Sequence, residues 1–426
     1  MRVTSVRTIW FMNRRQTVYP WAEAPRGSPA LSHPCVYDLP MSSPGTLVSL
    51  FAGVGGIDQG LARSGFQTTY LCESWEPARR VLHRRFPEVP VAGDINEIVA
   101  LPAADVIAGG FPCTDLSQAG RTAGIDGSQS GLVHKALSLA DGHPARWLLL
   151  ENVRNMLPLH GGRAMAAITN ELERLGYRWA YRVVDSRFAG VPQRRQRVIL
   201  LASRTEDPRP VLFADDAGER SSDSLADDHY GFYWTEGLRG LGWCQDGVPT
   251  LKGGSTIGIP SPPAIWRLQA EPGEKFVTPG IATAERMQGF RSGWTAPGAT
   301  GFRGQGARWK MVGNAVTVGV SAWIGRRLVQ PGTWDATIAQ PLKVGSSWPT
   351  AAWGERGKVW RVDVSLWPER NRYTHLASMM GADYESLSFR GAAGFLSRLE
   401  NGRLRVPEQF RLDMKEHIEF ARDAAA

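Results

Sequence analysis

The sequence predicts an α/β fold whose core is a doubly wound, mostly parallel sheet with helices on both faces. Two observations predict it. Short apolar runs of strand length recur along the first half of the 426-residue chain. Several of these runs end in glycine or polar residues, as expected where the carboxyl ends of parallel strands form a ligand site. The predicted strands cover residues 47–50, 69–72, 105–108, 147–150 and 198–202.

The first predicted strand runs into a glycine turn and then a helix. Residues 51–56 read FAGVGG, and residues 57–64 have a helical pattern. Glycines at such a turn allow positive φ angles and a close approach of the backbone to a ligand, while the helix offers free N–H groups at its start. An ordinary tight strand-to-helix connection can have the same pattern, so the turn alone does not establish a cofactor site.

An acidic residue, Glu73, follows the second predicted strand. It lies about 20 residues beyond the glycine turn, at the spacing where an acid accepts both hydroxyls of a ribose. No Gly-Lys-Ser sequence follows the turn, which favours an adenosine-bearing cofactor over a nucleoside triphosphate. S-adenosylmethionine is a cofactor of this kind.

A cysteine on a glycine-rich turn is the strongest candidate for chemistry. The stretch 109–117, GGFPCTDLS, follows the strand at 105–108 and includes Cys113. A thiol in this position is suited to act as a nucleophile. Taken alone, Cys113 could also be a small buried hydrophobic residue, as most free cysteines are.

Two further motifs accompany later strands. The strand 147–150 delivers Glu151 to the same sheet edge, where a carboxyl beside a thiol suits acid or base catalysis; the alternative is a cap for the next helix. Arg195 and Arg197 occupy alternate positions where another strand starts, so they share one face. Guanidinium groups there suit phosphate or base-edge contacts, although most charge runs are solvated surface.

In this order, the motifs resemble those of the bacterial and phage cytosine-5 DNA methyltransferase family. The turn 51–56 is similar to the family's cofactor turn, 110–113 to its nucleophile loop, 151–153 to its acid motif and 193–197 to its basic motif. The resemblance implies a Rossmann-like S-adenosylmethionine-dependent methyltransferase domain, a smaller inserted target-recognition domain and a C-terminal extension.

Two late stretches extend the resemblance. Residues 286–290, RMQGF, are similar to a helix that braces the recognition domain. Residues 310–316, KMVGNAV, are similar to a segment that returns beside the cofactor turn. The resemblance therefore covers residues 46–328.

The resemblance implies a reaction on cytosine in a specific duplex sequence. Cys113 adds its thiolate to carbon 6 of a flipped-out cytosine, so that carbon 5 becomes enamine-like and accepts the methyl group. Glu151 protonates or hydrogen-bonds ring nitrogen 3, and Arg197 holds the base oxygen. Which group takes the carbon 5 proton is not evident from the sequence.

Contacts with the cofactor and with DNA are also implied. The glycine-rich stretch 117–132 is expected to close over the flipped base, its alternative being an ordinary surface loop. The expected cofactor contacts are Phe51, Gly53, Gly55, Glu73, Asp94, Pro112, Leu132 and Asn314. The expected DNA contacts are Ser117, Arg121, Gln193, Arg195 and Lys252, with a supporting loop as the alternative for the segment around Lys252.

One position departs from the family's pattern. An apolar or aromatic residue often follows the ribose-binding acid and packs on the adenine, whereas Ser74 stands there in this chain. Trp75 comes one residue later, so adenine stacking by this tryptophan is an open question.

Composition agrees with a DNA-binding enzyme in a reducing compartment. The chain has 49 basic and 41 acidic residues, a formal charge of +8, which suits a phosphate-backbone partner. Its four cysteines have no metal-type spacing and no disulfide framework, which favours the cytoplasm. No apolar run reaches the roughly 18 residues that a membrane span needs.

The sequence divides into four predicted parts. Residues 1–45 lack periodicity and are expected to be disordered or a mis-assigned start, with Met41 as the natural beginning. Residues 46–204 and 305–330 form the catalytic domain, and 205–304 the recognition domain. Residues 331–426 form a tryptophan-rich extension of unknown role, ending in a helix at 408–424; Arg398, Arg403 and Arg405 could extend the DNA footprint.

Other functions remain possible at this point. The enzyme could methylate cytosine in transfer RNA, although the sizeable insert favours DNA. It could also be a DNA-binding regulator that retains a methylase fold. As a DNA methyltransferase, it would act as a monomer, either alone or beside a cognate restriction endonuclease.

Overall fold

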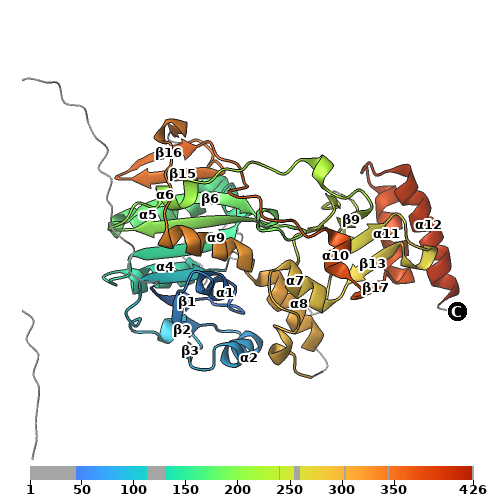
Figure 1. Cartoon of the computed structure of the whole chain (residues 1–426), viewed down its shortest axis with the longest axis horizontal. Helices are drawn as coiled ribbons and strands as arrows, with labels where there is room; N and C mark the ends of the chain where they lie inside the picture. The colour runs from blue at the N-terminus through green and yellow to red at the C-terminus, as the bar shows by residue number, and fades with distance from the viewer. Residues whose placement is uncertain are drawn as a thin grey trace, which may run out of the picture. The chain divides into compact units, whose positions relative to one another are not determined.

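The computed structural model describes residues 45–112, 130–238, 240–253, 260–301, 304–343 and 345–424 (Figure 1). The predicted start at Met41 and the segment before it lie outside these ranges. So do Cys113, Ser117 and Arg121.

The main sheet has ten strands within the described ranges, in the order β14-β16-β15-β6-β8-β5-β4-β1-β2-β3. Strands β3, β2, β1, β4 and β5 run parallel to one another, and β8 runs antiparallel to both of its neighbours, β5 and β6. Their bounds are β1 Thr46–Leu50, β2 Gln67–Cys72, β3 Val91–Ala92, β4 Val106–Gly110, β5 Trp147–Val153, β6 Arg178–Asp185, β8 Gln196–Ser203, β14 Ala339–Pro341, β15 Ala351–Glu355 and β16 Lys358–Val362. The five predicted strands are confirmed.

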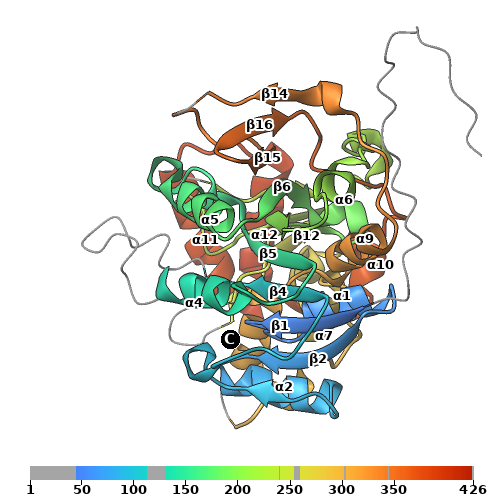
Figure 2. The ribbon, with the colours of Figure 1, turned by 90° about the vertical axis from the view of Figure 1, so that its left-hand side faces the viewer.

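Helices cover both faces of this sheet, which confirms the doubly wound arrangement. Figure 2 shows α4 and α5 on one side and α1, α6 and α9 on the other. Leu137 of α4 and Ile168 of α5 belong to one apolar core, whereas Leu61 of α1 and Trp323 of α9 belong to the second. The helices are α1 Gly56–Ala62, α2 Glu76–Arg85, α4 Ser130–Ala140, α5 Arg163–Arg174, α6 Arg209–Phe213 and α9 Val318–Val329.

A second, five-stranded sheet, in the order β10-β9-β12-β13-β17, forms the core of a smaller lobe. We name it the recognition lobe after the predicted domain at residues 205–304, which contains four of its five strands; β17 belongs to the extension. The strands are β9 His229–Phe232, β10 Cys244–Gln245, β12 Ala264–Arg267, β13 Phe276–Pro279 and β17 Tyr384–Ser386. Helices α11 (Phe389–Asn401) and α12 (Glu408–Asp423) close its core, which contains the buried residues Phe232, Phe395 and Phe410. The predicted final helix is confirmed, with Phe410 and Met414 on its buried face.

Residues after 330 contribute strands to both sheets. Strand β15 pairs antiparallel with β6 and carries β16 and β14 onto the edge of the main sheet. The chain then forms α10 (Leu376–Met380), and β17 pairs with β13 of the second sheet. The extension therefore continues the cores of both lobes.

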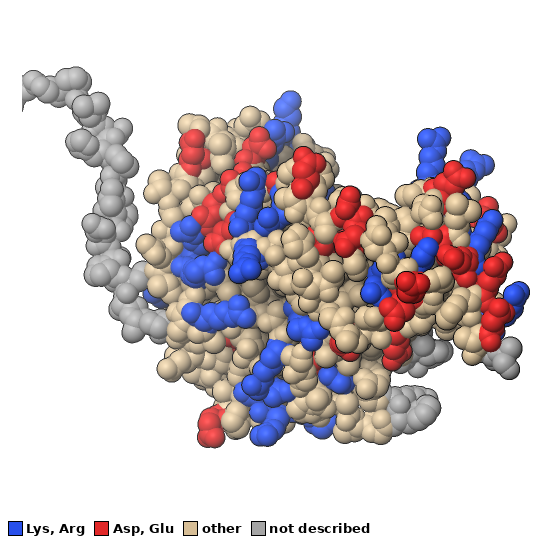
Figure 3. Space-filling model, turned by 45° about the vertical axis from the view of Figure 1, so that its right-hand side comes forward, with Lys and Arg blue, Asp and Glu red and all other residues tan. Residues whose placement is uncertain are grey.

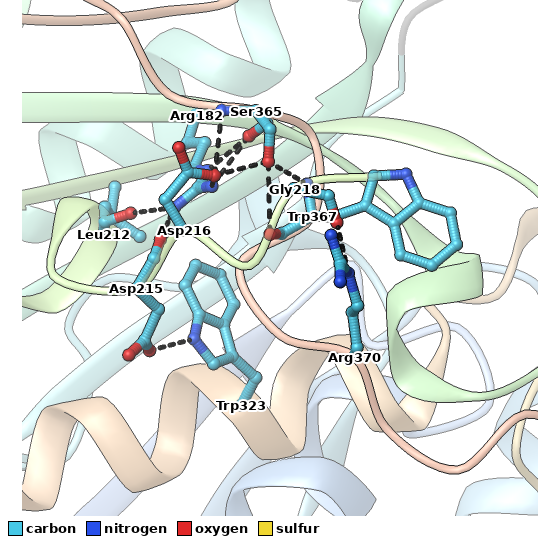
Figure 4. Close-up of polar contacts among 9 residues, drawn as sticks. All are labelled: Arg182, Leu212, Asp215, Asp216, Gly218, Trp323, Ser365, Trp367 and Arg370. Atoms are coloured by element: carbon cyan, nitrogen blue, oxygen red, sulfur yellow. Dashed lines mark hydrogen bonds and ion pairs between the residues drawn. The ribbon is translucent and has the colours of Figure 1, made fainter. Parts of the chain in front are cut away.

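A fully buried arginine fastens the extension to the main sheet (Figure 4). Arg182 of β6 donates to the carbonyl oxygens of Leu212 at 3.0 Å, Asp215 at 2.5 Å and Ser365 at 2.7 Å, and it pairs with the carboxylate of Asp216 at 3.1 Å. Burial lowers the pKa of Arg182 to about 10. Because these partners come from both the 212–216 segment and the extension, Arg182 joins three parts of the chain.

The remaining described elements connect the lobes. They include β7 (Gln193–Arg194), which pairs with β11 (Val248–Pro249), and the helices α7 (Ile281–Met287) and α8 (Gly304–Asn314).

None of the helices in the described ranges has the length and apolar character required to cross a bilayer.

Candidate active site

The glycine turn after β1 has the backbone geometry that the sequence predicts. Gly53 has a φ of 57°, and a Cβ added there would meet no atom within 4 Å, so this position opens onto free space. Gly56, the first residue of α1, has no room for a side chain, because a Cβ there would lie 2.3 Å from the carbonyl oxygen of Val316. The segment 310–316 therefore packs against the turn, as predicted.

Glu73, directly after β2, reaches this turn. Its carboxylate accepts hydrogen bonds from the backbone N–H groups of Gly53 and Trp75, both at 2.8 Å. Burial raises the pKa of Glu73, and the two backbone hydrogen bonds oppose that rise. The acid is thus held at the mouth of the glycine turn by the turn's own backbone.

The first residues of the thiol motif, Gly110 and Phe111, lie beside the acid motif because β4 and β5 are adjacent. Gly110 pairs with Glu151 across the two strands, and a Cβ on Gly110 would lie 3.1 Å from Oε2 of Glu151. Asn152 donates its side-chain amide to the carbonyl oxygen of Phe111 at 3.2 Å. That bond fixes the chain two residues before Cys113.

Arg197 completes this group from β8. Its Nε lies 2.9 Å from Oε1 of Glu151, and the two side chains are only 12% and 10% exposed. The antiparallel pairing of β8 with β5 aligns Arg197 with Val153, which brings the guanidinium beside the carboxyl. A carboxyl and a guanidinium are thus fixed next to each other near the carboxyl end of β5.

These groups share one cavity of about 430 Å³. Its wall includes eight of the predicted site residues: Phe51, Gly53, Glu73, Pro112, Glu151, Arg195, Arg197 and Asn314. It also includes residues that were not predicted, among them Val54, Asn152, Lys310 and Met311. Lys310 and Met311 belong to the stretch 310–316, so that motif could have indicated them.

Trp75, whose role the sequence left open, also lines the cavity. The ammonium group of Lys310 lies 4.6 Å from the centroid of its ring, a cation–π distance. The indole therefore forms part of the cavity wall with a lysine over one side of its ring, and adenine stacking by Trp75 stays an open question.

Three predicted cofactor residues lie outside the cavity wall. Gly55 is the left-handed residue before α1 and packs against Phe86. Asp94 is exposed and caps a short 3-10 helix by accepting from the N–H of Asn96. Leu132 packs half-buried against the core under α4. Their contact with a cofactor stays a prediction.

Two predicted DNA contacts are buried and already bonded to protein. The amide of Gln193 donates to the carbonyl of Met287 at 3.0 Å and accepts from the N–H of Leu251 at 3.1 Å. Arg195 donates to the carbonyls of Gly313 and Ala315, and burial lowers its pKa well below the usual value. These bonds give both residues a bracing role, and direct contact with DNA stays a prediction for them.

Lys252 lies at the surface of the recognition lobe. Its ammonium group pairs with Glu236 and sits 3.6 Å from the ring centroid of Tyr233. The residues 254–259 beside it lie outside the described ranges. Its predicted DNA contact is likewise untested.

The stretch 286–290 links the lobes as predicted. Gln288, just after α7, donates to the carbonyl of Val312 at 2.8 Å and accepts from the hydroxyl of Thr317 at 2.7 Å. Arg286 donates to the carbonyl of Met379 in α10. The segment therefore ties the returning helix α8 to both the catalytic lobe and the extension.

The fold and the site together define the class of this protein as the α/β methyltransferases. The chain has an acid at the glycine turn and a second polar group at the ends of the neighbouring strands. Residues 45–224 match the family model for the C-5 cytosine-specific DNA methylase. The chain is also 48% identical over 366 residues to the Type II methyltransferase M2.BsuMI of Bacillus subtilis, a match that covers 83% of this chain and 92% of that protein. The chain belongs to the C-5 cytosine-specific DNA methylase family.

More distant relatives agree with this assignment. The Type II methyltransferase M.MspI of Moraxella is 30% identical over 227 residues, which cover 51% of this chain and 53% of that protein. Among solved structures, the Dnmt2 methyltransferase of S. pombe superposes with a TM-score of 0.50 at 13% identity, covering 67% of this chain and 98% of that one. This last similarity concerns the fold alone.

Proposed function

We propose that this DNA cytosine-5 methyltransferase uses S-adenosylmethionine to methylate a flipped-out cytosine in a specific duplex sequence, with Cys113 as nucleophile. The observation that carries the proposal is the Glu151–Arg197 pair in the wall of the 430 Å³ cavity, next to the strand that leads into Cys113. Glu151 and Arg197 are the side chains proposed to hold the base.

The described residues fit the proposed cofactor. Gly53 leaves open space beside the backbone, and Glu73 is fixed where a ribose would need an acceptor. Phe51, Trp75 and Met311 supply apolar wall, and Asn314 supplies a polar group. When bound, S-adenosylmethionine would provide an electrophilic methyl group on a sulfonium.

The Glu151–Arg197 pair matches the edge of a cytosine. Ring nitrogen 3 and oxygen 2 are adjacent on that edge, so a carboxyl and a guanidinium must lie side by side to contact both. Glu151 would hydrogen-bond or protonate nitrogen 3, while Arg197 would donate to oxygen 2. Both contacts draw electron density from the ring and favour attack at carbon 6.

Cys113 is assigned as the nucleophile from its place in the sequence. The described cysteines, Cys72 and Cys244, are both buried free thiols. Burial raises the pKa of Cys72 to about 12 and raises that of Cys244, so neither is suited to form a thiolate. Cys113 follows directly after Pro112, which lines the cavity.

The proposed reaction balances around this thiol. The thiolate of Cys113 bonds to carbon 6, and the ring electrons move toward carbon 5 while Glu151 hydrogen-bonds or protonates nitrogen 3; any proton given there returns to Glu151 when the ring re-forms. Carbon 5 takes the methyl group, which S-adenosylmethionine would supply by breaking its sulfonium–methyl bond and leaving as a neutral thioether. A base then removes the carbon 5 proton, the electron pair re-forms the carbon 5–carbon 6 double bond, and the thiolate leaves.

We propose that the enzyme acts as a cytoplasmic monomer, either with a cognate endonuclease or alone.

The test measures transfer of a radiolabelled methyl group to plasmid DNA by wild type and Glu151→Gln. The substitution keeps the shape of the side chain but removes its acidic proton, so the rate should fall by about 10²–10⁴-fold. Cofactor affinity should stay unchanged. Glu88→Gln, which alters an exposed carboxyl on the same lobe, is the matched control and should retain full activity.

Transfer RNA is offered to the same preparations. Label in transfer RNA with none in plasmid DNA would contradict the proposed substrate. Wild-type activity in Glu151→Gln would contradict the assignment of Glu151.

A further inference from the structure

A second cavity, which we call the arginine cavity, lies apart from the catalytic one. Its volume is about 360 Å³, and its wall contains four arginines, Arg63, Arg84, Arg85 and Arg291, together with Trp294. The two cavities share no lining residue. The arginine cavity therefore needs its own explanation.

Three separate elements bring these arginines together. Arg63 follows the last residue of α1, Arg84 and Arg85 end α2, and Arg291 lies in the loop after α7. Figure 3 shows basic side chains gathered over the lower part of this face, where α1 and α2 lie in Figure 1, with few acidic side chains among them. The convergence depends on the tertiary fold, because the residues are distant in sequence.

The positive charge of the cavity is not neutralised by the described residues around it. Among the residues that the structure describes, no carboxyl group lines the cavity. The side chains of Arg84 and Arg291 are exposed and form no hydrogen bond or ion pair within the described ranges; the backbone carbonyl of Arg291 accepts from the N–H of Trp294. The nearby Glu285 is buried and already binds Arg308, Thr295 and the N–H of Gly293. An anion would relieve the repulsion among these guanidinium groups.

One arginine and one tryptophan form a fixed base for the cavity. Arg85 donates to the carbonyl oxygens of Gly293 at 2.6 Å and Trp294 at 2.9 Å, and its guanidinium lies 4.9 Å from the Trp294 ring. Arg291 lies 5.6 Å from the same ring. Trp294 in turn donates to the carbonyl of Val54, which lines the catalytic cavity. The arginine cavity is thus built directly behind the cofactor turn.

We propose that the arginine cavity binds a phosphate-bearing anion. Planar guanidinium groups match phosphate oxygens in pairs, and several converging arginines form a typical phosphate site. The phosphate could belong to a DNA backbone outside the catalytic cleft or to a small phosphorylated ligand. This site is independent of the proposed methyl transfer, since none of its residues belongs to the catalytic set.

The test is calorimetric titration of the full chain with inorganic pyrophosphate at constant ionic strength, without DNA. Wild type should bind at a single site. Arg84→Ala/Arg291→Ala should bind about tenfold more weakly or worse, because two charge-assisted contacts are lost. The charge-matched control Lys343→Ala/Lys358→Ala, at the far edge of the main sheet, should bind like wild type.

Equal affinity in all three proteins, or equal weakening in both variants, would overturn the proposal. Arg84 and Arg291 are exposed, so the variant should fold; Arg84→Gln/Arg291→Gln provides a second substitution that removes the charges while keeping polar side chains.

Competition then identifies the source of the phosphate. If the source is DNA, a long duplex should displace pyrophosphate, and the arginine variant should lose affinity for the long duplex but not for one that only fills the catalytic cleft. If the source is a small ligand, each duplex should bind wild type and the arginine variant with equal affinity. The arginine variant should still bind pyrophosphate more weakly than wild type does.

Discussion

At the scale of single residues, the candidate site consists of polar groups that the protein itself holds in place. Glu73 is fixed by two backbone N–H groups, Glu151 by Arg197, and the chain before Cys113 by Asn152. Such support reduces the reorganisation that substrate binding requires. Contacts within the protein therefore hold these groups in place.

The grouping of the predicted residues around one cavity could be predicted where a motif follows a strand. Parallel neighbours place their carboxyl ends at one edge, so Glu73, Pro112 and Glu151 could be expected together. The burial of Gln193 and Arg195 could not be predicted, because a charged run in sequence does not show which backbone carbonyls will face it. No strand was predicted directly before Asp94 or Leu132, so strand order did not indicate where these two residues lie relative to the cavity; in the structure Asp94 follows β3 and Leu132 lies in α4.

Asp58 allows a prediction on pH dependence. It is fully enclosed in α1, accepts from the hydroxyls of Ser49 and Thr68, and burial raises its pKa to about 6. The folded state therefore binds a proton more tightly than the unfolded state, so stability should fall as pH rises from about 4 to about 6. That fall should amount to about 3 kcal/mol.

Asp58→Asn should remove this part of the pH dependence and should be more stable relative to wild type at pH 7 than at pH 4. Urea unfolding of both proteins across this pH range measures the difference. Asp141→Asn, which changes an exposed carboxyl, is the control. Parallel stability curves for wild type and Asp58→Asn would refute the prediction.

At the level of helices and strands, the extension after residue 330 contributes to the apolar cores of both the main-sheet lobe and the recognition lobe. The helical spacing of Phe410 and Met414 predicted α12, because an amphipathic period is a local signal. The strands β14, β15, β16 and β17 were not predicted, since they are short and the two pairings that join them to the sheets, β15 with β6 and β17 with β13, link residues that are far apart in sequence. Only the fold shows that the extension continues both sheets.

Phe410→Ala tests whether the extension supports the recognition lobe. Phe410 is 0% exposed, and its ring lies 5.2 Å from Phe232 and 5.3 Å from Trp266, so removal should cost about 3–5 kcal/mol. Methylation of plasmid DNA should fall sharply. Cofactor affinity, which depends on the other lobe, should be retained.

The matched control for this experiment is Phe420→Ala on the same helix, where the side chain is 52% exposed. It should methylate DNA like wild type. If Phe410→Ala kept full methylation activity, α12 would have no role in supporting recognition.

At the scale of the whole molecule, the two lobes are interleaved along the chain. The chain leaves the main sheet after β8, builds most of the recognition sheet, returns through α8 and α9, and then adds strands to both sheets. Arg182 and Gln288 hold these passages together. The catalytic cavity and the recognition lobe are therefore positioned by a shared set of contacts.

The proposed cytosine-5 methylation of DNA through Cys113 is tested most directly by conversion sequencing of plasmid DNA from a methylation-deficient bacterium that expresses wild type or Cys113→Ala. We expect methylated cytosines in a single sequence context with wild type and none with Cys113→Ala. Unmodified DNA from a soluble wild-type protein that binds S-adenosylmethionine would contradict it, as would methylation that persists in Cys113→Ala.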